Sequence, residues 1–187
     1  MGSCAGLAAA MAGITMTDPQ KTLACFKEAG LDFDIKQFDH RLMAQKLTYL
    51  LQELGVKLGY EKTFSFYLRG TYSPTLTKDL FQSPASKPAV TLTQADKARI
   101  AKLRSAVDLR PHMLEVMAAY RYLRNQGKTE TDAIQTLRAT KPFLSPRDVA
   151  VGVSKCKGIF PEVTASDSAA LKEEMAAWDA AAEEDDR

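Results

Sequence analysis

Apolar residues recur every three or four positions along most of this chain, and that spacing predicts helices with one buried face. The strongest pattern covers residues 39–54, where Leu42, Leu47 and Leu50 share a face with Lys46. Shorter versions of the same pattern predict further helices over residues 18–30, 73–81, 93–107, 111–124, 129–138 and 145–156.

Residues that favour helix ends mark most of these boundaries. Asp18, Ser73 and Ser145 each precede a proline, so a capping side chain stands just before a proline at the first helical position. Thr93 is expected to cap the helix that follows it. Four glycines are expected to end helices, namely Gly30, Gly55, Gly127 and Gly158.

Only one segment has the composition of a strand. Residues 63–68 read TFSFYL, rich in aromatic residues, and residues 69–72 are expected to turn the chain after it. Residues 31–38 alternate between apolar and polar, which fits a short strand or an extended linker, and we favour the linker. The expected fold is mainly α, a compact helical domain with one small β-hairpin or strand element.

Composition divides the chain into three parts. Residues 16–165 are expected to form a single mainly helical domain. Residues 1–15 are apolar and small, and we expect a disordered or over-extended N-terminus, with Met16 opening the native protein. Residues 166–187 are expected to form an acidic, alanine-rich C-terminal helix that packs on the body through Leu171, Met175 and Trp178.

Charge is unevenly spread, although the net charge is only +2. Residues 167–187 hold eight acidic and two basic residues, a net charge of −6, so the rest of the chain carries +8. A mildly basic body indicates a nucleic acid or an acidic protein partner, or a body over which the acidic tail folds back.

No apolar run is long enough for a membrane span. The three cysteines are far apart, and reduced thiols in a cytoplasmic protein are the simplest explanation.

The sequence lacks the motifs of common catalytic sites, including glycine-rich phosphate loops, GxSxG and HExxH. An enzyme would have to use Asp39, His40 and Cys156, and nothing in the sequence places these residues together. Asp32, Asp34 and Asp39 lack the glycine and distal glutamate of a calcium loop. We therefore expect no enzyme, no metal site and no cofactor.

Basic side chains on two predicted helices leave DNA binding open as an alternative. The cluster comprises Lys97, Arg99, Lys102, Arg104, Arg121 and Arg124. The helices over 129–138 and 145–156 follow one another as in a helix-turn-helix, although a connection containing Lys141-Pro142 is longer than usual. The alternative function is a DNA-binding transcriptional regulator with a helix-turn-helix-like C-terminal half.

Two short motifs stand out between residues 38 and 81. The predicted helix contains Gln45-Lys46-Leu47-Thr48-Tyr49-Leu50, and the predicted strand is followed by Arg69-Gly70-Thr71-Tyr72-Ser73-Pro74. This stretch resembles the YwgA-like and Panacea-type proteins, the group that includes the SocA-like antitoxins. In that family a QK-x-x-Y-L helix precedes a strand and an (R/Y)GPYS turn, and here Thr71 replaces the proline.

The resemblance implies a mainly helical, non-catalytic protein-binding module, antitoxin-like or an adaptor in a toxin–antitoxin or defence context. Its partner would be a protein such as a toxin, and the oligomeric state stays open. The partner-binding residues implied by the two motifs are Gln45, Lys46, Tyr49, Arg69, Gly70, Tyr72 and Ser73. Gly70 allows a tight turn that presents Arg69 and Tyr72, both favoured interface anchors. In the other interpretation Tyr49 and Tyr72 pack inside and Arg69 caps a neighbouring helix.

Overall fold

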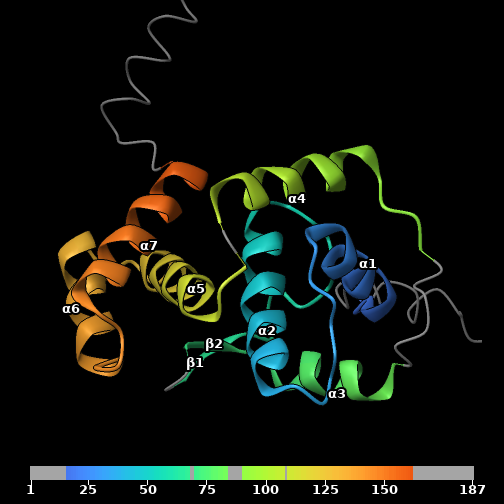
Figure 1. The fold of residues 1–187 in the computed structure, drawn as a ribbon, viewed down its shortest axis with the longest axis horizontal. Helices are drawn as coiled ribbons and strands as arrows, with labels where there is room; N and C mark the ends of the chain where they lie inside the picture. The colour runs from blue at the N-terminus through green and yellow to red at the C-terminus, as the bar shows by residue number, and fades with distance from the viewer. Residues whose placement is uncertain (1–15, 68–69, 84–89, 108, 162–187) are drawn as a thin grey trace, which may run out of the picture.

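A computed structural model of the protein describes residues 16–67, 70–83, 90–107 and 109–161 (Figure 1). Within these residues the chain forms seven helices and one two-stranded sheet, which confirms the mainly helical fold. The elements are α1 (Pro19–Ala29), α2 (Phe38–Glu53), β1 (Ser65–Tyr67), β2 (Gly70–Tyr72), α3 (Pro74–Gln82), α4 (Gln94–Ala106), α5 (Pro111–Asn125), α6 (Glu130–Thr140) and α7 (Pro146–Ile159).

Side-chain caps begin the helices where the sequence predicted them. The Asp18 carboxylate accepts a hydrogen bond from the Lys21 amide at 2.8 Å, and Ser73 and Thr93 cap α3 and α4 in the same way. Gly30 ends α1 with a φ of 84°, a left-handed conformation that favours glycine. These boundaries follow from local chemistry, because each cap satisfies an amide that its own helix cannot.

The core is organised around α5, which is buried along residues 113–120. It packs against α2, α6, α7 and β2, and α1 packs against α4 on the other side of α2 (Figure 1). Helix α7 approaches α5 closely at Gly152, where a Cβ atom would lie 2.5 Å from Cγ1 of Val116. A glycine is therefore required there for the two helices to keep their contact.

The hairpin corrects one prediction. Residues 69–72 were expected to turn the chain, whereas Gly70–Tyr72 is a second strand, antiparallel to β1. The register pairs Ser65 with Tyr72, Phe66 with Thr71 and Tyr67 with Gly70. Gly70–Tyr72 thus belongs to the ladder and leads directly into α3.

Two further expectations can be compared with the described residues. Residues 31–37 form no helix or strand, as the linker interpretation requires. Gly158 was expected to end the last helix, but α7 continues through it to Ile159, because Ile159 and Phe160 beyond it are buried in the core.

The expectations for residues 1–15 and 166–187 lie outside the described residues. None of the described helices is both long and apolar enough to cross a bilayer.

Candidate functional site

The first motif residue, Gln45, joins α2 to the start of α3. Its side chain is only 4% exposed. Its amide oxygen accepts a hydrogen bond from the Ser73 amide at 2.8 Å, and Nε2 donates to the Ser73 carbonyl at 3.2 Å and to Thr77 Oγ1 at 2.9 Å. The side chain thus pairs with Ser73 as a neighbouring strand would, and satisfies a buried backbone amide and carbonyl.

The next residue, Lys46, connects α2 to the hairpin. It is 2% exposed, and its ammonium group donates a hydrogen bond to the Thr71 carbonyl at 2.7 Å. A Cβ atom at Gly70 would lie 3.7 Å from Lys46 Nζ and 3.6 Å from Lys141 Nζ. Two ammonium groups therefore approach the same glycine, and β2 lies directly over them.

Lys141 carries the second ammonium group and forms an ion pair with Glu115. The two side chains are 0% and 4% exposed, and Nζ lies 2.5 Å from Glu115 Oε1. The rings of Phe66 and Phe143 lie 6.0 and 5.9 Å from the same nitrogen, at the outer limit of a cation–π contact. We call Lys46, Glu115 and Lys141 the buried lysine cluster. It ties α2, α5, β2 and the α6–α7 connection together.

Two pairs of aromatic side chains lie on the hairpin and on the segments around α5 that carry the cluster. Tyr67 is 50% exposed and meets Tyr72 edge-on at 5.6 Å, while Phe143 is 49% exposed and lies 6.4 Å from the His112 ring. We call Tyr67, Tyr72, His112 and Phe143 the aromatic rim. The hairpin and the α6–α7 connection occupy the same side of the molecule (Figure 1). Phe66, on β1, stacks on Tyr122 of α5 at 5.7 Å.

Tyr49, the aromatic residue of the helical motif, points inward. It is 6% exposed, its ring meets Phe64 at 5.3 Å, and its hydroxyl accepts a hydrogen bond from Asn125 Nδ2 at 3.2 Å. Burial, together with the nearby Glu53 carboxylate, raises the pKa of Tyr49 well above its usual value. The phenol therefore stays protonated and serves the packing between α2, α5 and the hairpin.

The structure brings the described motif residues together but places most of them inside. Gln45, Lys46, Tyr49, Gly70 and Ser73 are buried, Tyr72 is half-buried, and Arg69 lies outside the described residues. Thr71 is also buried, and its hydroxyl has no hydrogen-bond partner among the described residues. The motifs thus build the junction between α2 and the hairpin.

Neither the buried partner of Lys141 nor the exposed aromatic residues Tyr67 and Phe143 were predicted from the sequence. The burial of Glu115 could have been predicted, because it is the only charged residue in the apolar run 113–120. A lone carboxylate on a fully buried helix stretch requires a buried partner. Tyr67 and Phe143 left no comparable signal, since an aromatic residue at a strand or loop position is as often buried as exposed.

The six basic residues of the DNA-binding alternative come from α4 and α5, and those that form side-chain contacts have different partners. Arg121 pairs with Glu53 at 2.8 Å and lies 4.9 Å over the Phe160 ring. Arg124 Nη1 donates to the Lys128 carbonyl at 2.7 Å, near the end of α5. On α4, Lys97 and Arg104 border a hollow of about 540 Å³ beside α1, which Lys27 also lines.

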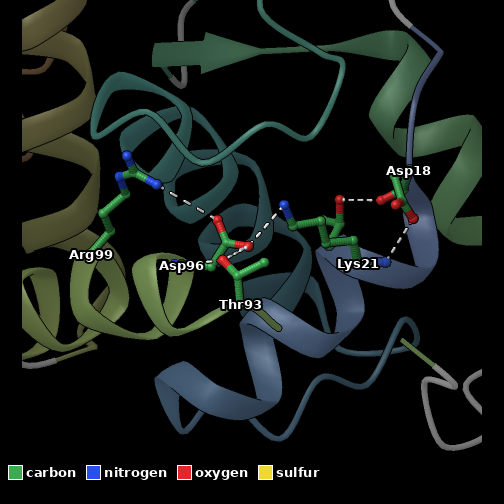
Figure 2. A network of polar contacts seen from close by, with 6 residues as sticks. Asp18, Lys21, Thr93, Asp96 and Arg99 are labelled. Atoms are coloured by element: carbon green, nitrogen blue, oxygen red, sulfur yellow. Dashed lines mark hydrogen bonds and ion pairs between the residues drawn. The ribbon is translucent and has the colours of Figure 1, made fainter. Parts of the chain in front are cut away.

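Another α4 cation, Arg99, belongs to a network between α1 and α4 (Figure 2). Its centre is Asp96, which contacts Lys21 Nζ at 3.0 Å, Thr93 Oγ1 at 2.9 Å and Arg99 Nη1 at 3.9 Å. Burial alone would raise the pKa of Asp96, but the hydrogen bonds from Lys21 and Thr93 outweigh it and hold that pKa below its usual value. The carboxylate is therefore charged near neutral pH.

The residues considered for catalysis or metal binding have structural contacts in separate parts of the fold. His40 Nδ1 accepts a hydrogen bond from the Asp34 amide at 3.0 Å, next to the start of α2. Cys156 is buried on α7, 3.6 Å from the Met117 carbonyl, and burial raises the pKa of Cys25 to about 12. The described residues contain no group of three or more His, Cys, Asp or Glu side chains arranged to hold a metal ion.

Comparisons with known proteins complete the description of the site. No protein-family model matches the chain, and neither the curated proteins nor the solved structures contain a significant match.

Proposed function

We propose that this protein is a non-catalytic, cytoplasmic protein-binding module of the antitoxin or adaptor type, and that the aromatic rim is its binding surface. The motif resemblance supports the class of function. The interior contacts of Gln45 and Lys46 support a refined role for the motifs. In this proposal the motifs hold the hairpin in place, and the rim outside them meets the partner.

The observation that carries the proposal is the exposure of two large aromatic side chains on segments that contact the buried lysine cluster. Tyr67 and Phe143 are each about half exposed. Phe143 lies 5.9 Å from Lys141 Nζ, and Tyr67 pairs in the ladder with Gly70, the glycine that Lys46 and Lys141 approach. Tyrosine and other aromatic residues contribute strongly to protein interfaces, since they bury a large area with few rotatable bonds. A segment that is already ordered also loses less conformational entropy when it binds.

A co-purification from the native host tests the proposal with a matched control. The double substitution Tyr67→Ala/Phe143→Ala removes the rim, whereas Phe81→Ala removes an aromatic side chain that is 61% exposed at the end of α3. Truncation of two interface anchors costs roughly 2 kcal/mol each, which lowers affinity more than a hundredfold. We expect a stoichiometric protein partner with the wild type and Phe81→Ala, and its loss with the double variant.

Equal recovery of that partner from all three proteins would contradict the rim as the binding surface. Recovery of no stoichiometric partner from any of them would contradict the protein-binding function itself. Circular dichroism of each variant checks that the helices are intact, because the rim residues lie outside the buried core.

DNA binding is the alternative, and one observation favours it. Lys27, Lys97 and Arg104 surround the hollow between α1 and α4, an arrangement that suits contact with phosphate groups. DNA binding of this kind weakens steeply as salt rises, because neutralised phosphates release counterions. The purified protein titrated with random duplex DNA at two salt concentrations separates the alternatives, and the protein-binding proposal predicts no tight, salt-sensitive association.

A further inference from the structure

A groove of about 330 Å³ lies between α6 and α7, and none of its lining residues belongs to the aromatic rim. Its floor is apolar, formed by Ile134 of α6 with Val149 and Val153 of α7. Ala150 lies at its surface and is exposed. Arg138 and Lys157 stand at its edges, and Lys157 is paired with Glu130 at 2.8 Å. The groove thus offers an apolar strip bordered by Arg138 and by the Lys157–Glu130 ion pair.

The C-terminal segment of this chain has the complementary pattern. Between residues 168 and 182 the large apolar residues are Leu171, Met175 and Trp178, spaced four and three apart. This spacing would place them on one face of a helix. The other positions are mostly alanine and acidic residues, and residues 167–187 carry a net charge of −6. The segment therefore combines a narrow apolar face with an acidic surround.

The chain is long enough to bring this segment to the groove. Helix α7 ends at Ile159, and the described residues end at Pro161. Ten residues lead from Pro161 to Leu171, and in extended form they span up to roughly 33 Å. The groove residues of α7, from Val149 to Lys157, extend over only about 12 Å of helix. The segment can therefore double back along α7 and reach every part of the groove.

We propose that residues 168–182 dock as an amphipathic helix in the α6–α7 groove, with Leu171, Met175 and Trp178 on its apolar floor. Docking covers Ile134 and Val153, and it brings the acidic residues of the segment next to Arg138 and Lys157. The opposite net charges of tail and body, −6 and +8, favour this intramolecular contact. The docked segment is a helix-in-groove contact of the kind that separate peptides make with helical proteins.

Trp178 is the only tryptophan in the chain, so the intrinsic fluorescence of the full-length protein reports on docking directly. The test variant is Ala150→Glu, which places a carboxylate at the surface of the groove. The matched control is Val151→Glu, the adjacent residue of α7, which is 37% exposed and does not line the groove. The variant Leu171→Asp/Met175→Asp removes the apolar face from the other partner of the contact.

Docking predicts blue-shifted emission and weak acrylamide quenching in the wild type and in Val151→Glu, at every protein concentration. Ala150→Glu and Leu171→Asp/Met175→Asp should shift the emission to the red and raise the quenching constant several-fold. Equal quenching in all four proteins would overturn the proposal. Protection that appears only at high protein concentration would also overturn it, since it would show pairing between copies of the chain.

Discussion

Two polar assemblies in this protein use the same chemical groups in different surroundings. The buried lysine cluster joins Lys141 to Glu115, whose side chains are 0% and 4% exposed to solvent, respectively. The network between α1 and α4 joins Asp96 to Lys21 and Arg99, whose side chains are 18% and 41% exposed (Figure 2). Both contain lysine–carboxylate contacts of 3.0 Å or less.

The two assemblies differ in burial and not in distance, so burial decides how much each contact contributes to the free energy of unfolding. When Asp96 is removed from the α1–α4 network, water can solvate the Lys21 and Arg99 charges that remain, so little is lost. When a partner is removed from the buried lysine cluster, the remaining charge stays in an apolar environment among Phe66 and Phe143. The cluster should therefore fix the hairpin, whereas the network should add modest stability.

The largest effect is expected from Glu115→Ala. This change leaves the Lys141 ammonium group buried without its carboxylate, and loss of one partner of a buried pair costs about 3–5 kcal/mol. Urea unfolding followed by circular dichroism measures the loss. The double variant Glu115→Leu/Lys141→Met removes both charges and should recover most of the stability. A double variant as unstable as Glu115→Ala would show that packing volume, and not the unpaired charge, is responsible.

A smaller effect is expected from Gln45→Ala. The change removes the acceptor of the Ser73 amide and a donor to the Ser73 carbonyl, both buried, and one unsatisfied buried group costs about 1–3 kcal/mol. Urea unfolding again gives the magnitude. Gln82→Ala, an exposed glutamine at the end of α3, is the control and should stay within about 0.5 kcal/mol of the wild type. Equal stability of the two variants would mean that Gln45 does not hold α3.

These contacts also mark where the sequence stops predicting the structure. The caps at Asp18, Ser73 and Thr93 were predictable, because each acts within three residues of itself. Helical periodicity even placed Lys46 on the buried face of α2. Its partner, the Thr71 carbonyl, lies 25 residues away, and no local pattern encodes that distance.

The strand at Gly70–Tyr72 and the extension of α7 through Gly158 escaped prediction for a related reason. A glycine is a local signal for a turn or a helix end, and tertiary packing overrode it at both positions. Gly70 takes its place in the ladder opposite Tyr67 with a φ of 80°, and α7 continues past Gly158 to the buried Ile159. The exposure of the aromatic rim likewise depends on packing that only the fold reveals.

The smallest loss of stability is expected from Asp96→Asn. The pH dependence of that loss separates the contribution of the Asp96 charge from that of its packing. The folded protein holds the pKa of Asp96 below its usual value, which is about 3.9 in an unfolded chain. The stabilisation from this carboxylate is therefore complete above that value and is lost as pH falls through the lower folded pKa. Near neutral pH the variant should be less stable by about 1 kcal/mol, as expected for a partly exposed ion pair.

Unfolding of the wild type and Asp96→Asn, measured from neutral pH down to acid, gives the difference in stability at each pH. The difference should shrink below pH ~4, because protonation of Asp96 makes the wild type resemble the variant. Other carboxylates titrate in both proteins and cancel in the comparison. A difference that stays constant in acid would mean that the Asp96 side chain acts through its shape and its bond with Thr93 and not through its charge. The contrast between the two assemblies would then rest on packing, and the double variant of Glu115 and Lys141 should show the same dominance of shape over charge.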